Sequence, residues 1–421
     1  MDPEPEPSRL QHAASFPEPF DPFELTDTVL GDVRDPYPML AKLRREASVH
    51  EGPLPIPGAA EPPRRGIPQF TVYGHDEVTQ VLRNHGVFSS SIYHDVVGMV
   101  MGRTILEMDE PEHRLKRALV SPAFRNRVLA RWETELVGSV VDGLIDRFAG
   151  NGRADLVREL LFDFPVQVIA RVLGLPIEDY PRFQRWSIEL LSVAANFERG
   201  AAASRSLAEY FATVLDERRV SPSHDLISDL ATTEVDGERL DDQEIFAFLR
   251  LLLPAGVETT YRASGNLLFG LLTHPDQLEA VRRDPSLVPQ AFEEALRWEP
   301  PLTILLRVST ADIELDGVRI PAGSHIGVCI AAANRDEARY QDPDGFDIFR
   351  DPRQHVSFGF GVHMCLGMHL ARMETRVAIS KLLERIDEVQ LDPGDLDPHI
   401  HGMAFRSPTA LPVKFSLTRS R

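Results

Sequence analysis

The stretch Phe358–Gly367, FGFGVHMCLG, places three glycines and a cysteine within ten residues. Glycine has no Cβ, so Gly359, Gly361 and Gly367 allow a sharply turning backbone that can approach a flat partner closely. The apolar periodicity that follows predicts a helix starting just after Cys365, with its N-terminal amides and positive dipole end aimed back at the sulfur. Both features favour a thiolate. From the residues alone, a buried structural cysteine remains the alternative, since that is the commonest state of a free cysteine.

The composition is that of a globular chain stabilised by packing. With 421 residues, 43% of them hydrophobic and 26% charged, it is long enough to bury a large core. Its two cysteines, Cys329 and Cys365, are too few for a disulfide framework, which suits a reducing compartment. The formal net charge of -19 argues against a nucleic-acid binder, because affinity for phosphate requires a basic surface. We expect a cytoplasmic enzyme.

The sequence predicts no membrane anchor. The N-terminal residues MDPEPEPSRLQ contain neither a basic segment nor an apolar core. The apolar stretches 251–257 and 326–333 are much shorter than the roughly 18 residues expected of a spanning helix. The acidic, Pro-rich composition of residues 1–22 predicts a flexible arm. Residues 23–421 are expected to form a single domain.

Apolar periodicity predicts a mostly helical fold with a smaller β region. Apolar residues three and four apart indicate helices at 35–47, across 113–253 and again after Cys365. Alternating patterns bounded by turn residues indicate strands at 70–74 and within 311–330.

The glycine and cysteine stretch also fits a family pattern. It matches F-G-x-G-x-H-x-C-x-G at Phe358, Gly359, Gly361, His363, Cys365 and Gly367. It therefore resembles the haem-binding loop of the cytochrome P450 family. The resemblance implies haem b as the cofactor, with Cys365 as the axial thiolate ligand of its iron. It also implies the cytochrome P450 fold, in which haem lies between the oxygen-binding helix and the cysteine-loop helix.

A second motif, EALR at 294–297, resembles the family's E-x-x-R motif. Residues three apart share one face of a helix, so Glu294 and Arg297 can form a bidentate pair. The stretch 334–350 resembles the loop that supplies a second arginine, which assigns Arg350 to this structural pair. Tyr340 stands where phenylalanine is usual. Without the other motifs, EALR would be interpreted as an ordinary pair on a helix surface.

A third motif, AGVETT at 255–260, interrupts an apolar helix. A glycine weakens the helix, and a threonine hydroxyl can bond back to a carbonyl, so the helix can open a local groove. The motif resembles the family's oxygen-binding groove, which implies that Ala255 contacts the cofactor, Thr259 binds dioxygen and Glu258 relays protons. Taken alone, the motif would be interpreted as a kink in which Glu258 faces solvent.

Several cationic or donor residues are implied to hold the haem propionates. In DEPEHRLKR (109–117), His113 and Arg117 lie four apart on one helical face. Family position adds the remaining contacts, Arg307, His355 and His363. Two propionates would be costly to bury without such partners.

The resemblance implies a monooxygenase that hydroxylates a lipophilic small molecule with O2 and two electrons. Family position suggests candidate substrate contacts, each of which could equally fill the core: Val96, Val97, Met99, Val100, Leu252, Leu302, Ile304, Leu305 and Phe405. A neutral steroid, terpenoid or macrolide-like compound is favoured, since no basic cluster awaits a carboxylate. The Pro- and Gly-rich stretch 51–68 is expected to be a surface loop, either inert or shaping the substrate entrance.

We expect a monomer that takes electrons from a separate ferredoxin or flavodoxin with its reductase, because no flavin-binding segment is recognised. Arg353 and Arg372 are candidates for a basic patch that meets this acidic partner. Two other functions remain open: a peroxygenase or oxidative-coupling haem-thiolate enzyme, and a non-enzymatic haem sensor. The presence of both Glu258 and Thr259 favours ordinary oxygen activation.

Overall fold

The computed structural model describes residues 23, 31–55, 66–191, 196–392, 394 and 396–418. The predicted arm at 1–22 and residues 56–65 of the predicted surface loop lie outside the described residues.

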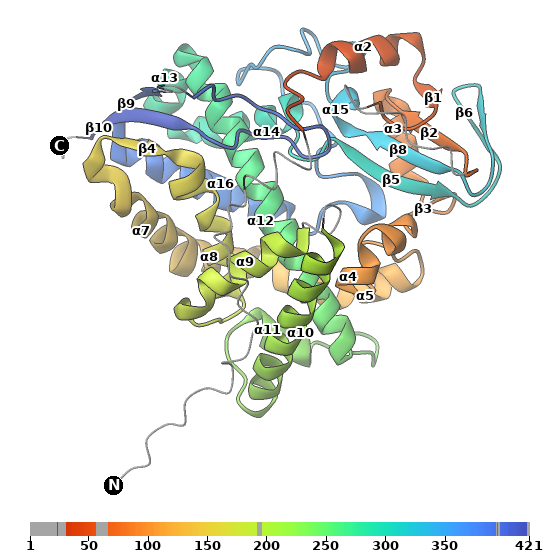
Figure 1. Ribbon diagram of the computed structural model, residues 1–421, viewed down its shortest axis with the longest axis horizontal. Coiled ribbons are helices and arrows are strands. Elements are labelled where there is room, and N and C mark those ends of the chain that lie inside the picture. The colour runs from red at the N-terminus through yellow and green to blue at the C-terminus, as the bar shows by residue number, and fades with distance from the viewer. Residues whose placement is uncertain are drawn as a thin grey trace.

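A 32-residue helix, α12 (Asp242–Thr273), runs through the middle of the molecule (Figure 1). It begins with a capping box, in which the Asp241 side chain accepts from the Glu244 amide and the Glu244 side chain accepts from the Asp241 amide. Around α12 the chain forms α2 (Tyr37–Glu46), α3 (His75–Arg83), α4 (Met99–Met101), α5 (Glu112–Val120), α6 (Asn126–Trp132), α7 (Gly138–Phe148), α8 (Asp163–Val172), α9 (Tyr180–Leu191), α10 (Phe197–Val220), α11 (Leu226–Thr232), α13 (Pro275–Arg283), α14 (Val288–Trp298), α15 (Ile330–Ala333) and α16 (Met368–Arg385).

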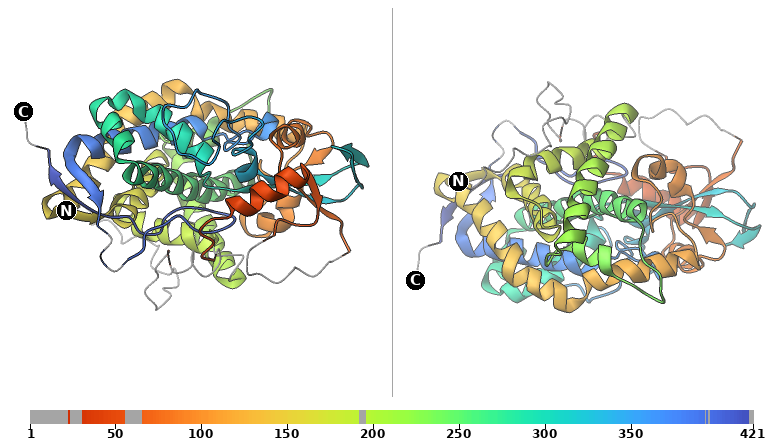
Figure 2. Two further views of the ribbon diagram at one scale, coloured as in Figure 1. Left: turned by 90° about the horizontal axis from the view of Figure 1, so that it is seen from above. Right: turned by 90° about the horizontal axis from the view of Figure 1, so that it is seen from below.

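The β structure is smaller and is divided between the two ends of the molecule, with the five-stranded sheet at one end and β4, β9 and β10 near the C-terminus at the other (Figures 1 and 2). A five-stranded sheet has the order β1-β2-β8-β5-β3, with β2 and β8 parallel. A three-stranded sheet has the order β4-β10-β9, and β6 pairs with β7. The strands are β1 (Val49–Glu51), β2 (Gln69–Val72), β3 (Phe88–Ser89), β4 (Arg153–Asp155), β5 (Ile304–Ser309), β6 (Ile313–Leu315), β7 (Val318–Ile320), β8 (His325–Cys329), β9 (Ile386–Leu391) and β10 (Pro412–Leu417). The predicted mainly α class with a smaller β region is confirmed.

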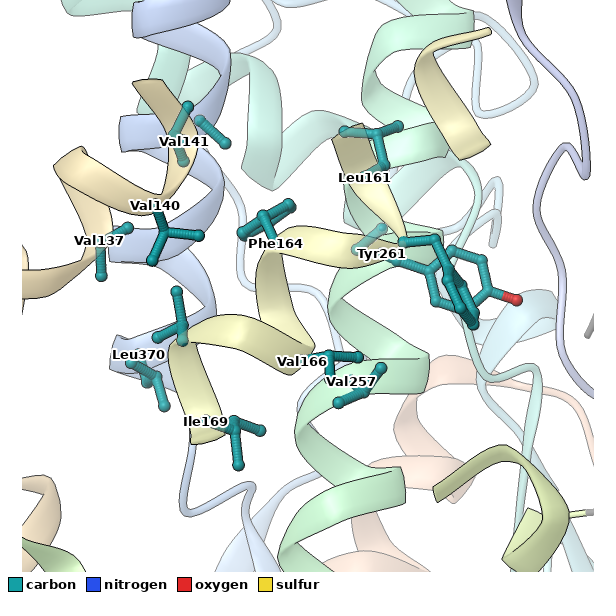
Figure 3. Close-up of a cluster of buried hydrophobic side chains, with 14 of the residues drawn as sticks. Val137, Val140, Val141, Leu161, Phe164, Val166, Ile169, Val257, Tyr261 and Leu370 are labelled. Carbon is teal, nitrogen blue, oxygen red and sulfur yellow. The ribbon is translucent and has the colours of Figure 1, made fainter. Parts of the chain in front are cut away.

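The main core lies where α7, α8, α12 and α16 meet (Figure 3). Gly256 permits this close packing, because a Cβ at that position would lie 2.4 Å from Cδ1 of Ile169 on α8. A buried bond of 3.0 Å between the hydroxyls of Ser264 and Thr375 joins α12 to α16. Labelled side chains of this core include Val137, Val140, Val141, Phe164, Val166, Ile169, Val257, Tyr261 and Leu370. None of the helices in the described ranges is long and apolar enough to cross a membrane.

Candidate active site

The cysteine loop is a tight turn against α3. The Cys365 amide donates to the Phe358 carbonyl at 2.8 Å, which closes the loop before α16 begins. Gly359 and Gly361 have φ values of +71° and +76°, a region that side chains disfavour. A Cβ at Gly361 would lie 2.6 Å from the Leu82 carbonyl oxygen. The loop therefore needs glycine at these two positions to lie where it does.

Opposing effects act on the Cys365 thiol. Burial raises its pKa, whereas the amides of Gly367 and Met368 and the guanidinium of Arg117 lower it. Burial is the larger effect, so the chain alone favours a neutral thiol. The predicted helix N-terminus is present but does not suffice to make a thiolate; a coordinating metal ion deprotonates such a thiol outright.

Two accessible residues sit on otherwise packed elements. The Cys365 side chain keeps accessible surface even though the surrounding protein desolvates its thiol, and Ala255 in the middle of α12 is also exposed, although Leu253 and Val257, two residues before and after it, are buried. A group bound between α12 and the cysteine loop needs accessible surface on both segments, and these two residues provide it.

A cluster of cationic and donor side chains lies beside the cysteine loop. The rings of His113 and His363 have centroids 4.1 Å apart. The Nε2 atoms of both are buried and have no protein hydrogen-bond partner within the described ranges. Arg117 donates from Nη2 to the Met364 carbonyl at 2.6 Å, and buried Arg307 donates to the carbonyl of Leu306 at 2.7 Å.

The carboxylate of Glu110 lies 3.3 Å from Nδ1 of His113, but the arginines of the cluster have no such partner in the described part of the chain. Among the described residues, neither Arg117 nor Arg307 forms an ion pair with a carboxylate, and burial lowers the pKa of each guanidinium. Burial, with His113 and the two arginines nearby, lowers the pKa of His363 to about 3. Unpaired buried cations and orphaned imidazole nitrogens are costly in a finished core. They fit the two propionates of a haem, so the residues present suit that group.

His355 lies apart from this cluster. Its Nε2 is 3.2 Å from Glu293, and its Nδ1 accepts from the Ser357 amide at 3.2 Å. Arg372 binds the same Glu293 carboxylate at 2.7 and 2.8 Å. A propionate contact for His355 therefore stays a prediction.

Glu294 and Arg297 form a buried bidentate pair on α14. Both donors of the Arg297 fork lie 2.7 Å from the Glu294 oxygens, and Arg350 adds a bond of 3.2 Å to the same carboxylate. Arg297 also donates to the carbonyls of Pro343 and Gly345 at 2.7 and 2.8 Å. The pair thus fixes α14 to the stretch 334–350.

Tyr340, which stands where phenylalanine was expected, is accommodated. Its buried ring stacks against the Arg297 guanidinium, with 5.4 Å between the guanidinium carbon and the ring centroid. Its hydroxyl donates to the Gln354 carbonyl at 3.0 Å.

The motif AGVETT lies in the middle of α12, directly after Pro254. Pro254, which sequence analysis overlooked, has no N–H to donate, and an interior proline loosens a helix locally. The Thr259 hydroxyl donates to the Ala255 carbonyl at 2.7 Å. Glu258 accepts from Nε of Arg262 at 2.8 Å, so its carboxylate is held by a cation rather than turned to open solvent.

The substrate candidates divide by exposure. Val96 and Met99 are 46% and 68% exposed, so these two side chains lie on the surface. Leu302 and Phe405 pair as an isolated β-bridge, and Cδ1 of Leu305 lies 3.9 Å from a Cβ built at Gly359, next to the cysteine loop. The other candidates are buried or half-buried: Val97, Val100, Leu252 and Ile304.

Comparisons with known proteins identify relatives of this chain. A family model described as Cytochrome P450 matches residues 189–410. The cytochrome P450 monooxygenase PikC of Streptomyces venezuelae is 35% identical over 396 residues, which cover 90% of this chain and 91% of that protein. Vitamin D(3) 25-hydroxylase of Pseudonocardia autotrophica is 40% identical over 289 residues, covering 68% of this chain and 71% of the relative. The crystal structure of CYP109E1 from Bacillus megaterium in complex with testosterone has a TM-score of 0.80 at 30% identity, covering 90% of this chain and 99% of the other.

Proposed function

The chain belongs to the cytochrome P450 family of monooxygenases, which hold haem b through a thiolate, and on that premise we propose that it hydroxylates a neutral lipophilic small molecule. The reaction uses O2 and two electrons from a separate redox partner. The observation that carries the proposal is a cluster of four residues beside the Cys365 loop: Arg117, Arg307, His113 and His363. Their charges and unpartnered ring nitrogens suit an anionic cofactor.

The chain's own residues bind the cofactor and exclude water. Cys365 ligates the iron, while the two arginines and two histidines hold the propionates. When bound, haem supplies the oxygen and electron chemistry that no side chain offers. Glu294, Arg297 and Arg350 keep the neighbouring helix and loop in a fixed arrangement, which in turn fixes the cysteine loop.

Proton delivery is assigned to α12. Thr259 places its hydroxyl one turn from Ala255, on the face of α12 that is accessible. Glu258 carries the proton that reaches this hydroxyl. Replacing Thr259 with alanine should divert reducing equivalents from product to peroxide, and unchanged coupling would contradict its role.

The substrate is a medium or large apolar compound. The pocket candidates Val100, Leu302, Leu305 and Phe405 are apolar, so burial of hydrocarbon supplies most of the affinity. Two comparisons support this class by their names: one relative is a vitamin D(3) hydroxylase, and one similar structure contains testosterone. We favour steroids, with terpenoids and macrolide-like compounds next.

Electrons come from a ferredoxin or flavodoxin that docks on the side of α16. A hollow of about 440 Å³ lies there, between α14, α16 and the stretch 339–353, with Arg350, Arg353, Arg372 and Arg376 in its lining. Arg372 is already paired with Glu293, so of the two arginines predicted for the patch, exposed Arg353 is better placed to meet an acidic partner.

The proposed function is tested by titrating the purified protein with steroids, terpenoids, macrolides and fatty acids while the haem spin state is followed. Compounds that shift the spin state are then incubated with a ferredoxin and its reductase, and products are identified. A hydroxylated product from one apolar class supports the proposal. No product from any class, in a protein that binds haem and accepts electrons, contradicts it.

A further inference from the structure

Arg262 is a buried cation that contacts Glu258, the residue assigned to proton delivery. Its side chain is 1% exposed and lies one helical turn after Glu258. Nε and Nη2 both donate to the same Glu258 oxygen, with 2.8 Å for Nε, and Nη1 donates to the Ser407 hydroxyl at 2.8 Å. The Arg262 guanidinium therefore donates to the Glu258 carboxylate on α12 and to the Ser407 hydroxyl, which is 145 residues away in the sequence.

The hydroxyl belongs to the C-terminal loop, defined here as residues 401–407. This loop also carries Phe405, whose ring centroid lies 5.6 Å from the Arg262 guanidinium. The centroid of the Tyr261 ring, which is labelled in Figure 3, lies 4.9 Å from the same guanidinium. Phe405 pairs with Leu302, and the Thr303 amide donates to the Ala404 carbonyl at 2.9 Å. The loop is thus bonded both to Arg262 and to the apolar segment beside it.

The chemistry of the site requires arginine. Burying a cation and a carboxylate costs several kcal/mol per ion in desolvation, which only good geometry and further hydrogen bonds offset. The planar fork of arginine can serve Glu258 and Ser407 at once from a single fixed position, whereas the ammonium of lysine is a point charge on a flexible stem. Lysine could keep the charge but not both contacts.

We propose that Arg262 is the positioning residue for Glu258 and that it couples this acid to the C-terminal loop. A substrate that packs against Phe405 steadies the loop, the loop steadies Arg262 through Ser407, and Arg262 steadies the carboxylate that delivers protons. This inference rests on the proposed function, because it assigns a role within that reaction.

The chain offers a matched control one turn along α12. Asn266 is also buried, and its Nδ2 donates to the carbonyls of Glu299 and Arg406 at 2.8 and 3.1 Å. It thus bonds the same loop from the same helix without touching Glu258. Replacing Asn266 with alanine removes a bond to the Arg406 carbonyl but keeps the contacts from Ser407 through Arg262 to Glu258 by which the proposed coupling runs.

The first test is hydrogen exchange, which needs no turnover. Backbone exchange of residues 401–407 is compared in the wild type, Arg262→Lys, Ser407→Ala and Asn266→Ala. Loss of a hydrogen bond to the loop predicts faster exchange in the loop for each variant, about tenfold where the lost bond is charge-assisted, as in Arg262→Lys and Ser407→Ala. Ligand binding should protect residues 258–262 in the wild type and Asn266→Ala, but not in Arg262→Lys or Ser407→Ala.

The second test measures the share of reducing equivalents recovered in product, with substrate affinity from the spin shift. Arg262→Lys and Ser407→Ala should lower this share several-fold at unchanged affinity, while Asn266→Ala should match the wild type. Ser407→Ala removes a single hydroxyl, so this variant still tests the contact if Arg262→Lys does not fold. Unchanged coupling in both variants overturns the role of Arg262, as does unchanged ligand protection at 258–262. Absence of product from the wild type contradicts the proposed function instead.

Discussion

The imidazole rings of His113 and His363 lie with their centroids 4.1 Å apart, and the Nε2 atom of each is buried without a protein partner in the described ranges. The first ring is on α5 and the second is in the cysteine loop. Two buried imidazole nitrogens without a protein partner, side by side on separate elements, indicate a ligand that they share.

Replacing His113 or His363 with phenylalanine should lower haem retention. Phenylalanine keeps a ring of similar shape but removes the nitrogen that would bond a propionate, and a hydrogen bond to a charged group contributes about 1.5–3 kcal/mol. The haem-to-protein ratio of purified variants is the measurement, with protein determined independently of haem absorbance.

His75 supplies the control for this pair of variants. It is buried and its Nε2 also has no partner within the described residues, but it belongs to α3 and pairs with Asp76. His75→Phe should retain haem as the wild type does. Equal loss of haem in all three variants would mean that general destabilisation explains the effect.

The two motif glycines Gly361 and Gly367 should respond differently to alanine. Gly361 has a φ of +76°, and its Cβ would clash with the Leu82 carbonyl. The backbone conformation alone costs a side chain about 1–3 kcal/mol. At Gly367 no protein atom in the described ranges lies within 4 Å of an added Cβ. Urea unfolding should show Gly361→Ala strongly destabilised and Gly367→Ala close to wild type; the reverse order would contradict the loop geometry.

Breaking the buried pair on α14 should cost more than removing its outer arginine. Arg297→Met leaves the Glu294 carboxylate buried without its bidentate partner, which typically costs about 3–5 kcal/mol. Arg350 contributes one bond of 3.2 Å to Glu294, and its other bonds go to backbone carbonyls from a more exposed side chain, so Arg350→Met should cost less. The unfolding free energies of the two variants are measured by urea titration. Equal losses of stability in Arg297→Met and Arg350→Met would contradict the bidentate bond between Arg297 and Glu294 as the stronger contact.

Acid should weaken the contact between Glu293 and its two partners. Burial alone raises the pKa of Glu293, but bonds from Arg372 and His355 outweigh it and hold the value at about 2. The folded value lies below the ordinary 4.5, so the stabilisation is present above pH 4.5 and is lost as the pH falls toward 2.

Thermal unfolding midpoints between pH 3 and 7 test this linkage. Glu293→Gln should unfold earlier than the wild type near neutral pH, and the difference should shrink as the pH falls toward about 2. A difference independent of pH would show that the carboxylate charge is not responsible.

Much of the fold was predictable because its signals are local. The turn residues Asp316 and Gly317 join β6 and β7 with positive φ, as their sequence indicated. The long helix after Cys365 begins at Met368, as apolar periodicity predicted. Such features depend on a few adjacent residues, so a single sequence contains them.

Features that depend on distant partners were not predictable in this way. Arg262 lies at helical spacing from Glu258, a signal that could have been noticed, but its bond to Ser407 joins residues far apart in the chain. The surroundings that raise the pKa of the Cys365 thiol come from elements that the loop sequence does not describe. The exposure of Val96 and Met99 was missed for the same reason.

The most direct test of the central claim is the absorption spectrum of the reduced protein with carbon monoxide, recorded for the wild type and Cys365→His. The account predicts that the wild type shows the red-shifted band characteristic of thiolate-ligated haem and that the variant, if it retains haem, lacks it. A thiolate-type band that persists in Cys365→His, or a wild-type band typical of histidine ligation, would contradict the assignment of Cys365 as the iron ligand.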